Sequence, residues 1–266
     1  MSQDGRFVAA EIEDPDTRAN NIWIYDTEKS TRTRFTFGQT PDANPVWSPD
    51  GQSLLFGSRA QGQHFSLFMK ASSGSDREQP LLQTQSDIYP EDLSRDKRFL
   101  LYTQVDPSEK SGASIRVLPL QGNGKPYLLV RSTADDRYAH FSPNGRWVAY
   151  RSNESGRNQI YVIRFGDAGG KWQISSNGGD RPVWRKDGQE LYFLSADSEL
   201  MAVGVRGEEP RFTFTPPEVL FKVDVLGGYG ERFAASPDGR RFLALVNKDQ
   251  APRPLSAVVH WAAQLK

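Results

Sequence analysis

The chain has 266 residues, and its 33 lysines and arginines balance 33 aspartates and glutamates, so the formal net charge is zero. A neutral chain offers no electrostatic attraction to nucleic acid or to an anionic membrane, and we expect neither as a partner. The absence of cysteine excludes disulfides and thiolate metal sites. No apolar run approaches the roughly 20 residues that span a bilayer, and the first ten residues lack the features of a signal peptide.

A repeat centred on a Ser-Pro-Asp-Gly turn recurs along the whole chain. Its copies begin near residues 2, 48, 94, 142, 185 and 236 and read SQDGRFVAAEI, SPDGQSLLFGS, SRDKRFLLYTQ, SPNGRWVAYRS, RKDGQELYFLS and SPDGRRFLALV. The starts are 46, 46, 48, 43 and 51 residues apart. Because these copies fill residues 1–266 and leave no linker, the sequence predicts a single domain of six similar units.

Each copy predicts four short strands in the same order. A strand leads into the turn at residues 44–47, 90–93, 138–141, 181–184 and 232–235, and a second strand follows the turn directly. A third strand is predicted at 21–27, 65–71, 114–120, 159–165, 200–206 and 256–261. A fourth is predicted at 31–37, 79–84, 126–132, 171–176 and 218–224. The first copy lacks its leading strand and the last lacks a clear fourth strand.

The turn itself indicates a tight hairpin. Asp-Gly and Asn-Gly suit a two-residue hairpin loop in which both central residues have positive φ. The third copy has Lys97 in the place of the glycine. We therefore expect that turn to be strained or of a different type.

Six copies of four short strands, without helical periodicity, predict an all-β fold: a six-bladed β-propeller of four-stranded antiparallel blades, with the first and last blades incomplete. We hypothesise that a segment before Met1 in a longer parent protein forms the first inner strand. A closed propeller has little need of a partner for its stability, so a monomer is expected.

The copies PVWSPDGQSLLFGS and AHFSPNGRWVAYRSNESGRNQIYV resemble the PD40, or TolB-like, class of WD40-related repeats. The second half, including GGDRPVWRKDGQELYFLSADSELMAVGV, is similar to the C-terminal propeller of bacterial Ser/Thr protein kinases. The resemblance implies a sensor or docking domain in a periplasmic or extracytoplasmic setting. No kinase signature occurs in this chain, so a catalytic domain would lie elsewhere in a parent protein.

The sequence offers few residues for catalysis. His64, His140 and His260 fall at unlike positions of their repeats, so we expect no shared metal site and no cofactor. The Asp14–Asn20 loop lacks the glycine and distant glutamate of a calcium loop. The serines at the repeated turns are predicted to cap them, and no Gly-x-Ser-x-Gly motif is present.

The predicted inner strands begin at one mouth of the propeller channel, where a binding site is expected. The candidate ligand-binding residues there are Asn44, Tyr89, Arg137, Tyr138, His140, Arg181, Tyr229 and Arg232. Arginine and tyrosine are enriched at binding hot spots, and an arginine can bind a carboxylate through two parallel hydrogen bonds. Alternatively, these arginines pair with aspartates of neighbouring blades and only solvate the mouth.

The favoured interpretation is a non-catalytic module that binds a protein or a small molecule at the channel mouth. One alternative is the propeller domain of a hydrolase or peptidase, whose catalytic domain would lie outside this chain. Others are a metal-dependent propeller lyase and a domain that only spaces its neighbours. Fold alone does not decide among them.

Overall fold

The structure is a computed structural model that describes residues 1–60, 62–106, 112–130, 132–166, 169–208, 211–225, 230–246 and 257–259. Within these ranges the regular structure is entirely β-strand, arranged in antiparallel sheets, which confirms the all-β prediction. The described part contains no helix with the length and apolar character to cross a membrane. The chain divides into two compact units, Met1–Asp135 and Asp136–Lys266. The single domain over residues 1–266 stays a prediction.

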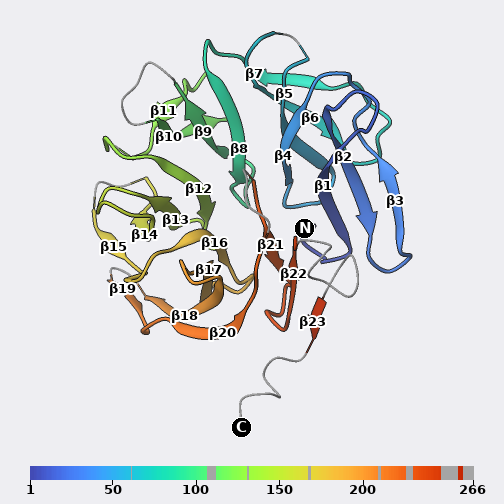
Figure 1. Cartoon of the computed structure of the whole chain (residues 1–266). Coiled ribbons are helices and arrows are strands. Elements are labelled where there is room, and N and C mark those ends of the chain that lie inside the picture. The colour runs from blue at the N-terminus through green and yellow to red at the C-terminus, as the bar shows by residue number, and fades with distance from the viewer. Residues whose placement is uncertain are drawn as a thin grey trace. The chain divides into compact units, whose positions relative to one another are not determined.

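The first unit holds three sheets whose strands pair in chain order (Figure 1). The first sheet contains β1 (Phe7–Glu13), β2 (Asn20–Asp26) and β3 (Thr31–Arg34). The second contains β4 (Asp42–Trp47), β5 (Ser53–Ser58), β6 (Ser66–Ala71) and β7 (Gln79–Leu82). The third contains β8 (Asp87–Leu93), β9 (Phe99–Val105), β10 (Ala113–Pro119) and β11 (Tyr127–Leu128).

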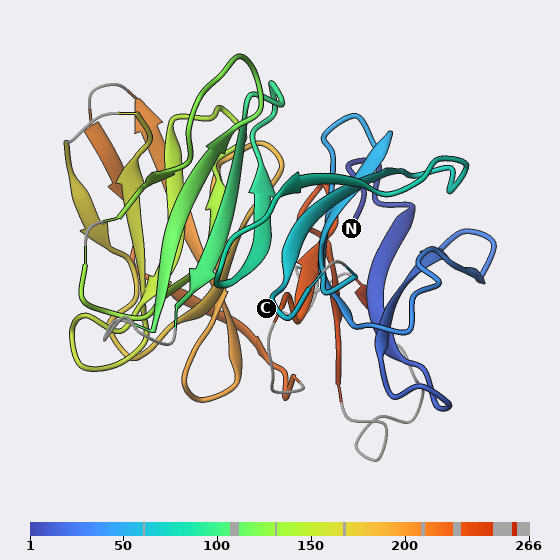
Figure 2. The ribbon, with the colours of Figure 1, turned by 90° about the horizontal axis from the view of Figure 1, so that it is seen from above.

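The second unit also holds three sheets. The first contains β12 (Asp136–Phe141), β13 (Trp147–Ser152), β14 (Gln159–Arg164) and β15 (Lys171–Gln173). The second contains β16 (Asp180–Trp184), β17 (Glu190–Leu194), β18 (Glu199–Glu208), β19 (Arg211–Phe214) and β20 (Glu218–Lys222). The third contains β21 (Phe233–Ala235), β22 (Arg241–Ala244) and β23 (Ala257–Val259). The β12–β15 and β16–β20 sheets lie side by side in both views (Figures 1 and 2).

The hydrophobic core lies between neighbouring sheets, because successive side chains of a second strand point to opposite faces. In β5, Leu54 and Phe56 pack with Ile22 of the first sheet, whereas Leu55 packs with Ile88 of the third. The second unit repeats the arrangement, with one buried cluster between its first two sheets and another between its last two. Each four-stranded sheet with a core on both faces is the blade of a propeller. The number of blades stays a prediction.

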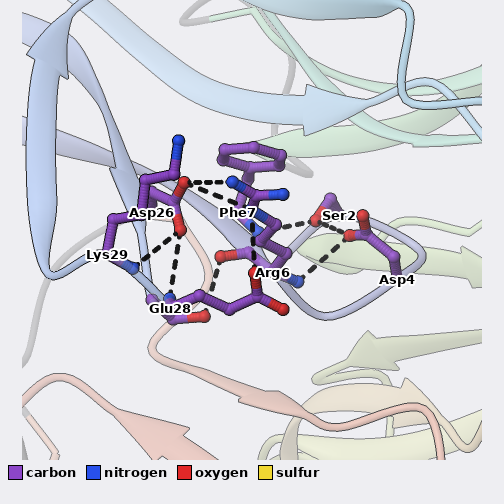
Figure 3. Close-up of polar contacts among 8 residues, drawn as sticks. Ser2, Asp4, Arg6, Phe7, Asp26, Glu28 and Lys29 are labelled. Carbon is purple, nitrogen blue, oxygen red and sulfur yellow. Dashed lines mark hydrogen bonds and ion pairs between the residues drawn. The ribbon is translucent and has the colours of Figure 1, made fainter.

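The repeated turn has a different geometry from the predicted one. Figure 3 shows its first copy, in which the Ser2 hydroxyl donates to Asp4 Oδ1 at 2.5 Å and accepts from the Phe7 N–H at 2.8 Å. The Gly5 N–H donates to the Ser2 carbonyl oxygen, and only the glycine has positive φ, at 78°. The prediction of positive φ at both central residues was therefore wrong. The serine and aspartate side chains hold a longer loop around a β-turn, and only its last residue requires the left-handed region.

The third copy keeps this geometry although it lacks the glycine. Lys97 has a φ of 58°, and its N–H donates to the Ser94 carbonyl oxygen at 2.7 Å. The turn type is thus unchanged, and Lys97 carries the strain of the left-handed region, which costs a non-glycine residue about 1–2 kcal/mol. Its ammonium group reaches Asp50 Oδ2 of the preceding turn at 2.6 Å.

Four inner strands contain a β-bulge at this place in the repeat, and in three of them, β4, β12 and β16, a non-glycine residue at the bulge has positive φ. Register shifts separate Ala43 from Val46 in β4, Arg137 from His140 in β12, and Asp180 from Val183 in β16. The residues with positive φ at these three shifts are Asn44 at 50°, Tyr138 at 55° and Arg181 at 50°. Since a bulge re-aims the side chains beside it, these strands present their residues differently from a regular ladder.

Two elements depart from the four-strand pattern. The hairpin of β18 and β19 is additional, because β20 also pairs with β18 and completes the expected blade. Among the described residues, the first sheet contains three strands, β1, β2 and β3. For the last sheet, His260 and the residues after it lie outside the described residues.

Candidate binding site

The candidate site lies in the second unit, where the bulges of β12 and β16 bring an aromatic ring against a cation. Tyr138 and Arg181 both stand four residues before the turn of their repeats. The Arg181 guanidinium carbon lies 4.8 Å from the centroid of the Tyr138 ring, and Arg181 Nη2 lies 3.5 Å from the Tyr138 hydroxyl. Both residues are buried. At this distance the cation and the ring attract each other, more strongly because water is excluded.

Asp180 joins this pair to a second arginine. Its Oδ2 forms an ion pair with Arg181 Nη1, and its Oδ1 lies 3.9 Å from Arg151 Nη1. Arg151 comes from β13 and also stands over the Tyr138 ring, at 5.2 Å. Burial raises the pKa of Asp180, and the nearby Glu231 adds to this, whereas Arg181 and Arg151 oppose it. Tyr138 is therefore held by two cations that share one carboxylate.

A third segment, residues 230–231, contacts the same residues. Arg181 Nε donates to the Gly230 carbonyl oxygen at 2.8 Å, and Glu231 Oε1 lies 2.9 Å from His140 Nε2. Trp184 Nε1 donates to the His140 carbonyl oxygen at 3.1 Å. Residues 230–231, which precede β21, are thus tied to both β12 and β16. We call Tyr138, His140, Arg151, Asp180, Arg181 and Glu231 the bulge cluster.

The accessible part of the bulge cluster consists of two carboxylates and an imidazole. The side chains of Glu231 and Asp180 are 39% and 29% exposed and that of His140 is 17% exposed, whereas those of Arg151 and Arg181 are only 10% and 8% exposed. The nitrogens of the Arg181 guanidinium meet acceptors of the protein inside the cluster. A ligand would first meet carboxylate oxygens and an imidazole, so the cluster suits a ligand with N–H or O–H donors.

The structure brings together three of the residues predicted from the sequence: Tyr138, His140 and Arg181. Each nitrogen of Arg181 meets an acceptor of the protein, and binding of a ligand by Arg181 stays a prediction. Arg137 and Arg232 are half-buried on or beside β12 and β21. Tyr229 lies outside the described residues.

Asn44 and Tyr89 belong to the first unit. The Asn44 N–H donates to Glu11 Oε1 at 2.9 Å, so Glu11 of β1 supports the bulge of β4. The Tyr89 ring packs on Phe65, with centroids 4.9 Å apart. The binding of a ligand by Asn44 and Tyr89 stays a prediction.

The sequence analysis missed Arg151 and Glu231 as members of the cluster. Arg151 is the only charged residue of the strand Trp147–Ser152. A charged residue in a second strand, where most positions are apolar, could have indicated a functional position. Glu231 carries no such signal, because its role depends on a contact with His140 across 91 residues of sequence. His64 lies in the first unit, 3.5 Å from Asp87, and His260 lies outside the described residues. Within the described ranges, no group of three or more histidine, aspartate or glutamate residues is placed to hold a metal ion.

No family model matches the sequence. The uncharacterised peptidase YuxL of Bacillus subtilis is 19% identical over 349 residues, which cover 92% of this chain and 52% of the peptidase. An uncharacterised protein of Agrobacterium fabrum is 25% identical over 265 residues, which cover 80% of this chain and 87% of that protein. This chain therefore spans about half the length of its peptidase relative.

Solved structures define the fold. TolB from Acinetobacter baumannii superposes with a TM-score of 0.74 and 18% identity over 97% of this chain and 62% of TolB. A puromycin-hydrolysing peptidase of Mycobacterium tuberculosis gives 0.63 and 17% over 91% of this chain and 42% of the peptidase. An oligogalacturonate lyase in complex with manganese gives 0.64 and 12% over 95% of this chain and 71% of the lyase. The chain has a TolB-like β-propeller fold, and the resemblance to the kinase propellers stays a prediction.

Proposed function

We propose that this chain is a non-catalytic binding module, a six-bladed propeller that serves as a sensor or docking domain of a larger bacterial protein. Six sequence repeats support the number of blades. The partial coverage of YuxL and TolB supports a longer parent. Its ligand is a peptide segment or a small polar molecule that donates hydrogen bonds to the bulge cluster.

The observation that carries this proposal is the shared strain of the inner strands. Each non-glycine residue with positive φ costs about 1–3 kcal/mol, and such residues concentrate where a site must be held in one shape. Here two of them, Tyr138 and Arg181, lie in contact, beside the exposed carboxylate of Glu231, the half-buried carboxylate of Asp180 and the imidazole of His140. A sheet without a binding role could form without either bulge and would not lose this stability.

The peptidase relatives favour a second candidate, a propeller that accompanies a catalytic domain. This chain covers 52% of YuxL and 42% of the Mycobacterium tuberculosis peptidase, so about half of each lies outside the match. In that case the bulge cluster would contact a substrate peptide of the attached domain. Both candidates require a site that binds without reacting, and they differ in what the parent protein carries.

A thermal-shift screen of this chain against peptides, sugars, cell-wall fragments and divalent metals tests the proposal, because binding to the native state raises the melting temperature by mass action. Hits are repeated with Glu231→Gln, which alters an exposed acceptor of the cluster, and with Glu218→Gln, a matched change at an exposed residue of β20. A saturable shift that Glu231→Gln weakens and Glu218→Gln leaves unchanged supports the site. A screen without a saturable hit, followed by a pull-down without a captured protein, overturns it.

A further inference from the structure

The inference concerns Arg59, which lies between β5 and β6 in the first unit. Its guanidinium carbon lies 4.4 Å from the centroid of the Phe65 ring, and that ring packs on Tyr89 with the two centroids 4.9 Å apart. Phe65 is buried, so the ring that supports the guanidinium is itself held by its neighbours. The side chain of Arg59 is nevertheless 39% exposed. A half-exposed cation is thus fixed in place by an aromatic ring.

The protein uses few of the hydrogen-bond donors of Arg59. A guanidinium has five N–H donors. Among the described residues, the Arg59 side chain forms one hydrogen bond, from Nη2 to Asp87 Oδ2 at 3.3 Å, which is long for two charged groups. Its Nε is buried and has no hydrogen-bond partner in the part of the chain that the structure describes. Arg59 therefore keeps donors for a ligand, in contrast to Arg181, whose nitrogens all meet acceptors.

Asp87, the first residue of β8, holds a second nitrogen group at the same place. The His64 imidazole is 39% exposed, and its Nδ1 lies 3.5 Å from Asp87 Oδ1. The same Oδ1 accepts from the Phe65 N–H at 2.8 Å, so the carboxylate also anchors the segment between β5 and β6. Asp87 thus positions two half-exposed groups, a guanidinium and an imidazole, while its own side chain is 25% exposed.

We propose that Arg59 and His64 form a binding site for a carboxylate group of a peptide ligand. The planar fork of a guanidinium matches a carboxylate through two parallel hydrogen bonds, and an imidazole N–H can donate a third. The carboxylate can be the C-terminus of the peptide or the side chain of an aspartate or glutamate. A phosphate dianion suits the site less, because it would meet the negative charge of Asp87 beside a single arginine.

This site has the opposite chemistry to the bulge cluster. The bulge cluster exposes carboxylates to a ligand, whereas Arg59 and His64 expose N–H groups. The two sites share no residue and belong to different units of the chain. The carboxylate site does not rest on the function proposed for the bulge cluster, so either proposal can fail without the other.

An NMR titration of the isotope-labelled 266-residue chain tests the site, because chemical shifts report weak binding of small probes. The probes are acetyl-Ala-Ala-Ala with a C-terminal carboxylate, acetyl-Ala-Glu-Ala-amide, and the uncharged acetyl-Ala-Gln-Ala-amide. The Arg59 Nε–H and Phe65 backbone N–H signals should shift and saturate with at least one of the two carboxylate probes. The glutamine probe should leave both signals unchanged. The carboxylate probe that binds more tightly identifies the source of the carboxylate.

Variants connect the shifts to the residues. Arg59→Lys keeps the charge but loses the planar fork, and it should weaken binding by about tenfold, read from the Phe65 N–H signal. Arg77→Lys, the same change at an exposed arginine of the first unit, should leave the affinity unchanged. His64→Gln, at a half-exposed side chain, should also weaken binding. A dispersed amide spectrum and an unchanged melting temperature show that each variant is folded.

Three results would overturn the carboxylate site. One is the absence of a saturable shift with both carboxylate probes. Another is an equal shift with the glutamine probe, or equal affinities of Arg59→Lys and Arg77→Lys, because binding would then not depend on a carboxylate held by Arg59. The third is inorganic phosphate that binds more tightly than either carboxylate probe, which would assign the site to another class of anion.

Discussion

Arg181 and Tyr138 occupy the same position of two neighbouring inner strands, both with a left-handed backbone, and the Arg181 guanidinium carbon lies 4.8 Å from the centre of the Tyr138 ring. This contact explains how the protein maintains the strained, left-handed backbone of both residues. Each bulge turns its side chain towards the other, and Asp180 and the Gly230 carbonyl oxygen hold the arginine there. Through these contacts Arg181 stabilises the folded structure of the site.

Replacing Arg181 should therefore cost stability. Arg181→Ala leaves the half-buried Asp180 without its nearest cation and removes a hydrogen bond to Gly230, and breaking a buried ion pair costs about 3–5 kcal/mol. Because Asp180 keeps some solvent and Arg151, we expect a loss of about 2–3 kcal/mol in the free energy of unfolding, measured in urea. Arg157→Ala, at an exposed arginine of the same unit, should change it by less than about 0.5 kcal/mol. Equal effects of the two replacements would contradict the role of Arg181.

Lys97 tests the geometry of the repeated turn. Both Lys97→Gly and Lys97→Ala remove the ion pair with Asp50, but only glycine accepts a φ of 58° without strain. Lys97→Gly should be more stable than Lys97→Ala by about 1 kcal/mol in chemical denaturation. A glycine variant no more stable than the alanine variant would show that the left-handed region is not strained at this turn.

The additional β18–β19 hairpin should stabilise the hydrophobic core of the second unit through Phe212. Phe212 of β19 is buried, with its ring centroid 5.1 Å from that of Trp147 and 5.3 Å from that of Trp172. Phe212→Ala should cost about 3 kcal/mol and shift the tryptophan fluorescence, because water then reaches both indoles. Phe214→Ala, at an exposed ring of the same strand, should cost less than about 1 kcal/mol. An unchanged emission spectrum in Phe212→Ala would mean that the hairpin does not pack on this core.

Stability should fall at acidic pH through two surface carboxylates. The hydrogen bond from Arg6 lowers the pKa of Asp26 to about 2, and the Ser94 hydroxyl and the Arg98 N–H lower the pKa of Asp96 to about 2. A carboxylate whose pKa is lower in the folded state stabilises the protein above its unfolded pKa, near 3.8, and loses this as the pH falls through 2. The urea midpoint should drop between about pH 4 and pH 2. A double variant, Asp26→Asn with Asp96→Asn, should show a shallower drop, and a wild-type slope in that variant would count against this assignment.

The sequence predicts the sheets well because turn and strand chemistry are local. The serine and aspartate of each turn and the alternating residues after it lie within a few positions, and their hydrogen bonds join residues at most five apart. The bulges were not predicted, since Asn44-Pro45 and Arg181-Pro182 read as ordinary starts of strands. The contacts of Arg181 with Tyr138, and of His140 with Glu231, span 43 and 91 residues, and they depend on how neighbouring sheets pack.

The most direct test of the account is amide hydrogen exchange of the chain with a saturating ligand from the thermal-shift screen. If the bulge cluster is the binding site, exchange should slow at residues 138–140, 180–181 and 230–231, with Glu231→Gln reducing both the protection and the affinity. Protection confined to other strands, with these three segments exchanging as in the free chain, would contradict the proposed site.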